Sequence, residues 1–301
     1  MIPSSTAIEV RGLSKRIRKT TVLEPVDLVV PRGAIYALVG HNGAGKTTLI
    51  KILLNILQPT AGEATILGLA STRLRGEAFK WIGYVSENQE MPEWMTVQQL
   101  MRHLSSLYPR WEDAGLLKDL QLPTERTIKH LSRGMRMKVA LASVLAFEPE
   151  IVIMDEPFSG LDTAVRSEII QTLLDRAHDN EMTVLISSHD LEEIETFATH
   201  IAFLRGGRLL FSEPIEVLLE RCREVTVTFE TEIANREITK LAAGCVAAEA
   251  QGAMLRFVDV GANVHDHEGA IRELMPDAVQ VQSEGMNLKA IFMALNKGVR
   301  S

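Results

Sequence analysis

Gly40-His41-Asn42-Gly43-Ala44-Gly45-Lys46-Thr47 is the stretch of sequence that decides the fold. A short apolar run at residues 34–39 precedes it, and residues 47–57, which have the apolar spacing of a helix, follow it. The stretch fits the pattern G-x-x-x-x-G-K-[ST] between a strand and a helix, which is typical of a phosphate-binding loop. These flanking elements disfavour the alternative, a glycine turn that merely joins a strand to a helix.

This phosphate-binding loop supplies most of the candidate nucleotide-binding residues. Its glycines allow successive backbone N–H groups to point at an anion, and the helix N-terminus adds partial positive charge at the same point. Lys46 can reach the β- and γ-phosphates, and the Thr47 hydroxyl can bind Mg²⁺. We give His41 no catalytic role, because it occupies a variable position of the pattern. The residues expected to bind nucleotide here are Gly40, Asn42, Gly43, Ala44, Gly45, Lys46, Thr47 and Thr48.

An acidic pair at the end of a second buried strand completes the expected site. Residues 151–154 are apolar and lead directly into Asp155 and Glu156. Asp155 is placed to hold the Mg²⁺ shell, and Glu156 projects beyond the strand, where its carboxylate can polarise an attacking water. Beside a phosphate-binding loop, this pair is better explained as part of a site than as a solvated strand end.

Composition bounds the class of protein. The chain has 301 residues, 46% of them hydrophobic, and a formal net charge of −7, which argues against a nucleic-acid partner. Cys222 and Cys245 are too few for a disulfide framework, so a reducing cytosol is the expected compartment. The first 12 residues show no signal peptide, and the uncharged run at 139–147 is far shorter than the roughly 20 residues of a membrane-spanning helix.

Two domains are expected. Alternating strands and helices predict an α/β domain with parallel βαβ units at residues 1–219, with a helix-rich insert at about 87–145. Residues 220–301 predict a small α+β domain, with strands at 224–230, 253–260 and 278–282 and helices at 234–242, 267–275 and 287–296. This second domain has no catalytic spacing. His265 and His267 flank Asp266, but the cluster lacks the third spaced ligand of a metal site.

Three further motifs give the chain a resemblance to the ATP-binding-cassette (ABC) ATPases. Leu131-Ser132-Arg133-Gly134-Met135 resembles the family signature LSGGQ, Ser159-Gly160-Leu161-Asp162 the D-loop, and Ser187-Ser188-His189-Asp190 the switch-histidine loop. Together with the two sites above, five motifs in the family's order cover residues 7–215. The insert sequence Tyr108-Pro-Arg-Trp-Glu112, the LSRGM form and the tail NLKAIFMALNKG are similar to the YtrB-type ATPases of bacterial exporters.

The resemblance implies a P-loop NTPase cassette that uses ATP and Mg²⁺ and pairs head to tail with a second ATP-binding subunit, either the same chain or a close paralogue. In that pair Ser132 and Gly134 of one subunit close over ATP held by Lys46 of the other, and Asp162 contacts the interface. Glu156 is then the general base and His189 contacts the γ-phosphate, so that Glu156, His189 and Lys46 form the catalytic set. A separate membrane permease is implied, with this chain peripheral on the cytoplasmic face of the membrane.

The sequence departs from the family pattern at several positions. Ile17 occupies the place of the aromatic residue that stacks on adenine in many members. Glu87 stands where the Q-loop has glutamine, and is expected to bind Mg²⁺ or water; Gln89 is a less suitable substitute. Arg133 replaces a signature glycine and Met135 the glutamine, whereas Ser132 and Gly134 are retained.

Two other functions remain open from the sequence. One is a soluble ATPase switch that acts on ribosomes or nucleic acid, and the other is a regulatory module in which ATP binding matters more than hydrolysis. For the transporter, we expect the permease to dock near Glu87 and residues 94–111. Trp94, Tyr108 and Trp111 either mark that surface or form the core of the insert.

Overall fold

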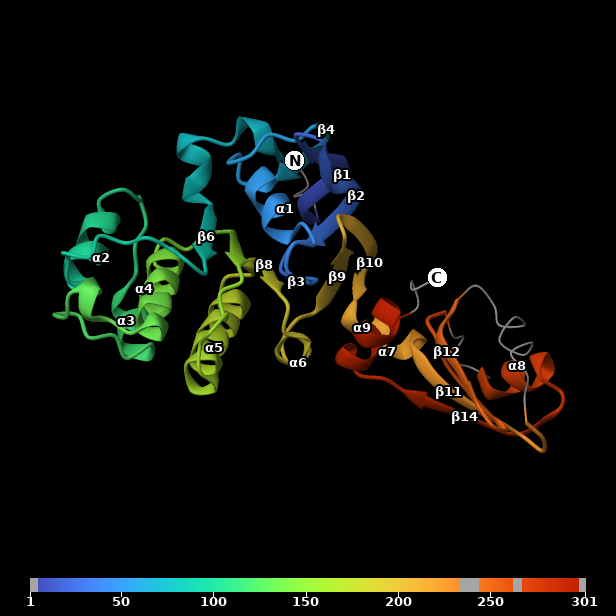
Figure 1. The fold of residues 1–301 in the computed structure, drawn as a ribbon. Helices are drawn as coiled ribbons and strands as arrows, with labels where there is room; N and C mark the ends of the chain where they lie inside the picture. The colour runs from blue at the N-terminus through green and yellow to red at the C-terminus, as the bar shows by residue number, and fades with distance from the viewer. Residues whose placement is uncertain (1–4, 233–243, 262–266, 298–301) are drawn as a thin grey trace. The chain divides into compact units, whose positions relative to one another are not determined.

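The computed structural model describes residues 5–232, 244–261 and 267–297, which separate into two compact units, Met1–Ser212 and Glu213–Ser301 (Figure 1). The first unit contains a six-stranded sheet in the order β10-β9-β3-β8-β7-β6. Its strands are β3 (Ile35–Val39), β6 (Ile82–Ser86), β7 (Ile151–Asp155), β8 (Thr183–Ser188), β9 (His200–Arg205) and β10 (Arg208–Pro214). Neighbouring strands from β9 to β6 are parallel. β3, β7 and β8 are buried along their whole length, which explains their continuous apolar runs.

A second, antiparallel sheet packs beside the phosphate-binding loop's helix. Its order is β2-β1-β4-β5, from β1 (Thr6–Ile17), β2 (Thr20–Pro31), β4 (Ala61–Ile66) and β5 (Leu69–Ala70). One apolar core joins residues of this sheet, such as Leu28, to Leu49 and Leu53 of helix α1 (Lys46–Leu53) and to Ile153 of β7. The helix and both sheets are therefore held as one body around the loop.

The predicted insert is helical. It contains α2 (Val97–Ser105), α3 (Ala114–Asp119) and α4 (Arg133–Leu145), which lie together in Figure 1. Thr96 and Gln99 form a capping box at the start of α2, and α4 is buried along residues 137–145. The remaining helices of this unit are α5 (Thr163–Asp179) and α6 (Leu191–Ile194), with short 3₁₀ turns η1 (Ser71–Arg73), η2 (Gly76–Lys80) and η3 (Ile128–His130).

The second unit is an α+β fold. Its antiparallel sheet has the order β12-β13-β11-β14, from β11 (Arg223–Phe229), β12 (Cys245–Gln251), β13 (Met254–Asp259) and β14 (Ala278–Gly285), with helices α7 (Ile215–Arg221), α8 (His267–Leu274) and α9 (Leu288–Lys297). Val225 and Val227 of β11 form its core with Phe257 and Ile271. The predicted strands and two of the predicted helices are confirmed, whereas the helix predicted at 234–242 lies outside the described residues.

Two details of this unit differ from the sequence prediction. The units separate at Ser212/Glu213, and the boundary expected after residue 219 falls inside α7. The reason is that Arg221 pairs with Glu213 and donates to the Val260 carbonyl, contacts that hold α7 to the second unit. Strand β12 was not predicted, because its alanine-rich segment has little β-propensity.

No helix among the described residues is both long and apolar enough to cross a membrane.

Candidate active site

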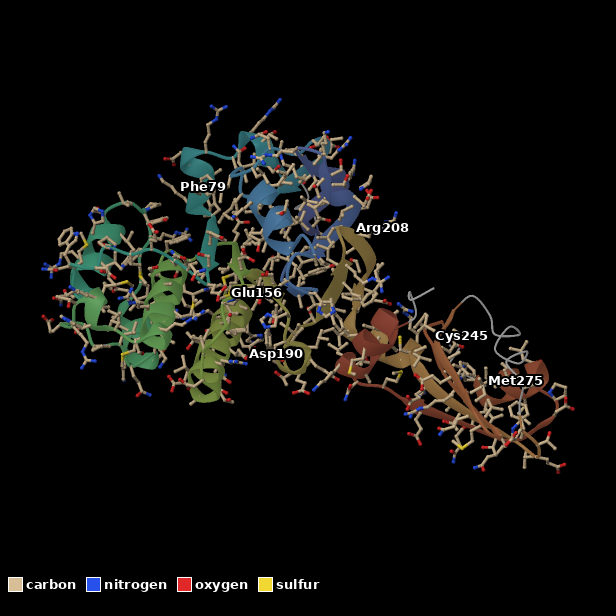
Figure 2. The ribbon with its side chains drawn as sticks, in the orientation of Figure 1. Phe79, Glu156, Asp190, Arg208, Cys245 and Met275 are labelled. Atoms are coloured by element: carbon tan, nitrogen blue, oxygen red, sulfur yellow. The ribbon has the colours of Figure 1, made fainter. Side chains whose placement is uncertain are left out.

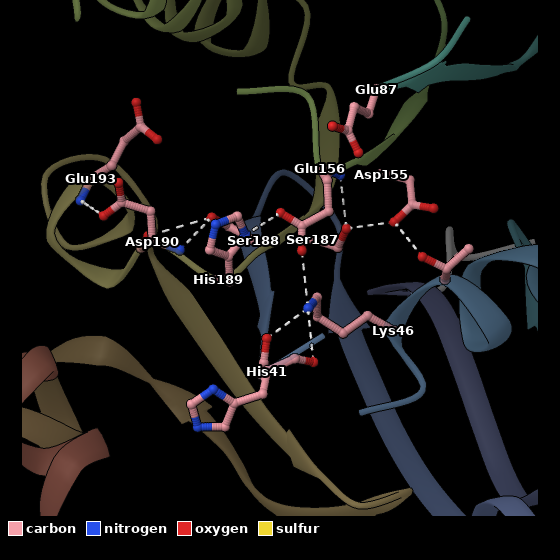
Figure 3. A network of polar contacts seen from close by, with 12 residues as sticks. His41, Lys46, Glu87, Asp155, Glu156, Ser187, Ser188, His189, Asp190 and Glu193 are labelled. Carbon is pink, nitrogen blue, oxygen red and sulfur yellow. Dashed lines mark hydrogen bonds and ion pairs between the residues drawn. The ribbon is translucent and has the colours of Figure 1, made fainter. Parts of the chain in front are cut away.

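The carboxyl ends of three neighbouring parallel strands bring the predicted motifs together. In the sheet register Val39 lies opposite Ser188, and Asp155 lies opposite Ser187. The loop after β3, the acidic pair at the end of β7 and His189 after β8 therefore meet at one edge of the sheet, as Figure 3 shows. Ligand sites in open α/β sheets form at this edge.

The phosphate-binding loop is fixed by its glycines. Gly45 has φ 108°, and a Cβ there would lie 2.7 Å from Leu23 Cδ2, so neither the backbone nor the space accepts a side chain. A Cβ on Gly40 would lie 2.2 Å from the Leu204 carbonyl oxygen. Asn42 and Gly43 are exposed at the tip, whereas Ala44 and Lys46 are buried. The loop thus presents its backbone to solvent over a tightly packed base.

Lys46 is a buried cation at this edge, with its side chain 5% exposed. Its ammonium donates to the carbonyl of Gly40 at 2.6 Å and to that of His41 at 3.3 Å, and pairs with Glu156 Oε1 at 2.9 Å. Glu156 is its one carboxylate partner among the described residues, and a buried ammonium also attracts the anionic oxygens of a phosphate. His41 itself contributes its backbone carbonyl to this contact, and its side chain is exposed.

Thr47 and Asp155 form a hydroxyl–carboxylate pair. Thr47 Oγ1 donates to Asp155 Oδ1 at 3.1 Å, and Ser187 Oγ donates to the same oxygen at 2.7 Å. Ser187 Oγ also accepts from the backbone N–H of Glu156 at 3.0 Å. Hydroxyl and carboxylate oxygens suit Mg²⁺, so Thr47 and Asp155 fit their predicted role. Ser187 belongs to the switch-histidine motif found in the sequence, but its contacts with both acidic residues were not predicted from the sequence.

Glu156 stands between a cation and an imidazole. Its Oε2 lies 2.8 Å from His189 Nδ1, while its Oε1 contacts Lys46 (Figure 3). The carboxylate is 15% exposed, and its backbone has φ 50°, a left-handed conformation that is costly for a residue with a side chain. Figure 2 places Glu156 in the middle of the first unit. The arrangement can hold a water and accept its proton.

The histidine loop is anchored by a second charged group that the sequence analysis missed. Asp190 caps α6, and its Oδ2 lies 3.3 Å from Nη1 of Arg166 on α5. The same nitrogen lies 3.7 Å from Glu193. Burial raises the pKa of Glu193, and Arg166 opposes that shift. These contacts fix the segment that follows His189.

Glu87 lies close to the site through its backbone, but its side chain contacts the signature. Its N–H donates to the Asp155 carbonyl at 3.0 Å, whereas Oε1 lies 2.7 Å from Arg133 Nη2. The pKa of Glu87 is lowered mainly by a hydrogen bond with Ser159 and, to a smaller extent, by the hydrogen bond and the positive charge of Arg133. Its role as a Mg²⁺ ligand stays a prediction. Gln89 accepts from the Ser86 N–H at 3.2 Å and supports the loop.

The signature and D-loop residues begin helices and face solvent. Ser132 caps α4 by accepting from the Met135 N–H at 3.3 Å, and Asp162 caps α5 by accepting from the Val165 N–H at 3.0 Å. Both residues are exposed. A Cβ on Gly134 would lie 3.0 Å from Val165 Cγ1, so this glycine permits close packing of α4 on α5.

The aromatic residues of the insert separate into two groups. Tyr108 stacks on Phe147, with ring centroids 4.1 Å apart, and lies 6.0 Å from the Trp111 ring. Trp94, in contrast, is 74% exposed. A separate cavity of about 810 Å³ is lined by residues that include Glu87, Glu93, Leu131 and Met137. Tyr108 and Trp111 are therefore half-buried residues that pack within the insert, and Trp94 is at the surface.

The other candidates occupy peripheral positions. Ile17 ends β1 and is 47% exposed. His267 is buried and lies 3.0 Å from Asp259 Oδ2 and 2.9 Å from Ser283 Oγ, which gives it a structural role. His265 and Asp266 lie outside the described residues, and the part of the chain that is described holds no group of three potential metal ligands.

Comparison with known proteins finds relatives of the chain. The ABC transporter family matches residues 23–159. The bacitracin transport ATP-binding protein BcrA of Enterococcus faecalis is 33% identical over 224 residues, 73% of either chain. The ABC transporter ATP-binding protein YtrB of Bacillus subtilis is 27% identical over 97% of this chain and 99% of its own.

A solved ATP-binding subunit of an ABC transporter superposes with a TM-score of 0.66 at 28% identity, over 71% of this chain and 92% of the other. The predicted fold class is thus confirmed. The chain belongs to the ATP-binding subunits of the ABC transporter family, and it is an ATPase.

Proposed function

We propose that this chain hydrolyses ATP to drive a separate membrane permease, and that the transport is export. Export is supported by BcrA, whose name gives bacitracin transport, and by the similarity to YtrB over nearly the whole length of both chains. The observation that carries the proposal is the position of Glu156, in contact with both Lys46 and His189 at the end of β7.

In this proposal Lys46 and the backbone of the phosphate-binding loop hold the β- and γ-phosphates. Thr47 and Asp155 would hold Mg²⁺, which would neutralise negative charge on the phosphates. Glu156 accepts the proton of the attacking water, and His189 keeps the carboxylate and the water in line. When the triphosphate binds, Lys46 pairs with its phosphate oxygens. Glu156 is then released from its ion pair with Lys46 and can accept the proton of the water.

The site is completed by a second ATP-binding subunit, either another copy of this chain or a close paralogue. The support is that Ser132 and Asp162 are exposed and that each side chain accepts a hydrogen bond from the first turn of its own helix. An exposed serine at a helix N-terminus is well suited to bind a phosphate presented by a partner.

The permease docks in the 810 Å³ cavity between the Q-loop and α4, whose lining includes Glu93, the residue before Trp94 in sequence. A groove with both apolar and charged lining is typical of a binding surface, and exposed tryptophans such as Trp94 are enriched at interfaces. Docking there holds the chain at the cytoplasmic face of the membrane. The groove touches Glu87, so movement of the permease can reach the Asp155 strand end through the Glu87 backbone.

Affinity purification tests this proposal. The tagged Glu156→Gln chain, with ATP, is used as bait in detergent-solubilised membranes of its own host, and Glu63→Gln, an exposed residue of β4, is the matched control. We expect one or two polytopic proteins at near-stoichiometric yield, more with Glu156→Gln than with the control. Recovery of ribosomal proteins, or of no membrane protein, would instead support a soluble ATP-driven switch.

A further inference from the structure

Two of the departures from the family pattern contact each other. Glu87 stands in place of the Q-loop glutamine, and Arg133 stands in place of the first signature glycine. In the folded chain Arg133 Nη2 lies 2.7 Å from Glu87 Oε1. A carboxylate and a guanidinium therefore replace two neutral residues at positions that are 46 residues apart in sequence but adjacent in space.

The guanidinium also packs on the D-loop. A Cβ at Gly160 would lie 2.9 Å from Arg133 Nη1, so that the guanidinium covers the backbone just before Asp162. Glu87 is hydrogen-bonded to Ser159 of the same loop, and its N–H donates to the Asp155 carbonyl. The pair thus connects the start of α4, the end of β6 and the loop that follows Glu156.

The position of Arg133 at the start of its helix favours an anion outside the helix. Arg133 is the first residue of α4, where the helix dipole disfavours a cation. No acidic residue is present in the first turn of α4. Glu87 is the carboxylate that compensates the guanidinium.

The position of Glu87 favours a cation in turn. Its backbone is bonded to the residue that holds the Mg²⁺ shell, so an unpaired carboxylate here adds negative charge close to a bound triphosphate. Arg133 cancels that charge, and the pair has the same net charge as the neutral residues it replaces.

We propose that Glu87 and Arg133 are positioning residues that act as one matched pair, in which Arg133 neutralises Glu87 and holds its carboxylate at the signature instead of at the Mg²⁺ that the sequence predicted it to bind. This inference rests on the proposed function, because it requires ATP at Lys46 and Glu156. In this proposal neither Glu87 nor Arg133 alone can replace the family's residue at its position. The two together replace the Q-loop glutamine and the first signature glycine.

A double-mutant cycle tests the pair. Glu87→Gln and Arg133→Gly each restore the family's residue at one position, and their combination restores it at both. Each single variant leaves one uncompensated charge, so we expect kcat/KM to fall roughly threefold to tenfold, with Arg133→Gly acting mainly by raising KM for ATP. The double variant is expected to return to within about twofold of the original chain. Arg133→Lys retains the charge and should keep KM within about threefold.

Two measures separate this from a purely structural effect. The double-mutant cycle is repeated with Arg133→Ala in place of Arg133→Gly, because a glycine at the start of α4 can by itself destabilise the helix. Arg32 and Glu150 form a comparably exposed pair at 2.8 Å, at the far end of β7, and Glu150→Gln with Arg32→Ala is the matched control cycle. It should leave KM unchanged. ATP affinity is measured by calorimetry in the Glu156→Gln background, so that binding is read without hydrolysis.

The outcomes are distinct. Additive effects of the two substitutions on KM and on ATP affinity, or a double variant weaker than either single one, would overturn the pairing. If Glu156→Gln hydrolyses ATP at the original rate, the proposed site fails, while the calorimetric cycle still decides whether Glu87 and Arg133 are coupled.

Discussion

Ser187→Ala probes the link between the two acidic residues of the site. The substitution removes the 2.7 Å hydrogen bond to Asp155 and leaves the Glu156 N–H without its 3.0 Å acceptor. A hydrogen bond to a carboxylate contributes about 1.5–3 kcal/mol, and an unsatisfied N–H costs at least about 1 kcal/mol. Since Asp155 retains its bond from Thr47, we expect the free energy of unfolding of the first unit to fall by about 2–4 kcal/mol.

Tryptophan fluorescence during urea denaturation measures this change. All three tryptophans, Trp81, Trp94 and Trp111, belong to the first unit, so their signal reports that unit alone. Ser143→Ala is the matched control, because this buried serine donates only to the Ala140 carbonyl of its own helix and should cost less than about 1 kcal/mol.

Catalysis should respond to Ser187→Ala as well. A looser Asp155 and a freed Glu156 backbone are expected to lower kcat by about tenfold and to raise the Mg²⁺ concentration needed for half-maximal rate. Equal unfolding free energies for Ser187→Ala and Ser143→Ala, together with an unchanged Mg²⁺ requirement, would refute this explanation of the strand-end geometry.

Three further predictions follow from individual side chains. Lys46→Ala should weaken ATP binding by about 10- to 100-fold in calorimetry, because it removes the buried cation of the loop; an unchanged affinity would contradict the phosphate assignment. Trp94→Ala should lower the yield of co-purified permease, whereas Tyr108→Ala should instead destabilise the insert by about 2 kcal/mol in the fluorescence assay. Cys222 should resist Ellman's reagent at pH 8 in the folded chain, since burial raises its pKa to about 11, and rapid labelling of two thiols would count against that.

Much of the catalytic edge could be predicted from the sequence, because its motifs depend on local chemistry. Glycines at positions 40 and 45, a lysine after them and a carboxylate after an apolar strand each specify a conformation or a charge by themselves. Their convergence also followed from the sequence, since parallel βαβ units bring the carboxyl ends of strands to one edge.

The missed contacts depend on which strands and helices are neighbours. Ser187 acts on Asp155 because β7 and β8 are adjacent in register, and Arg166 reaches Asp190 across two helices. The Glu87–Arg133 pair likewise joins segments that no local pattern connects. The boundary between the units lies before the predicted one, because the ion pair of Arg221 with Glu213 belongs to the second unit and no local sequence pattern indicates this pair.

The role of Glu156 is tested most directly by the rate of γ-phosphate release from saturating ATP by the Glu156→Gln chain. Loss of the general base should slow release by about 100- to 10,000-fold, which corresponds to about 2.7–5.4 kcal/mol of activation free energy, while ATP remains bound at Lys46. A rate within threefold of the original chain would contradict the claim that this carboxylate, between Lys46 and His189, activates the water.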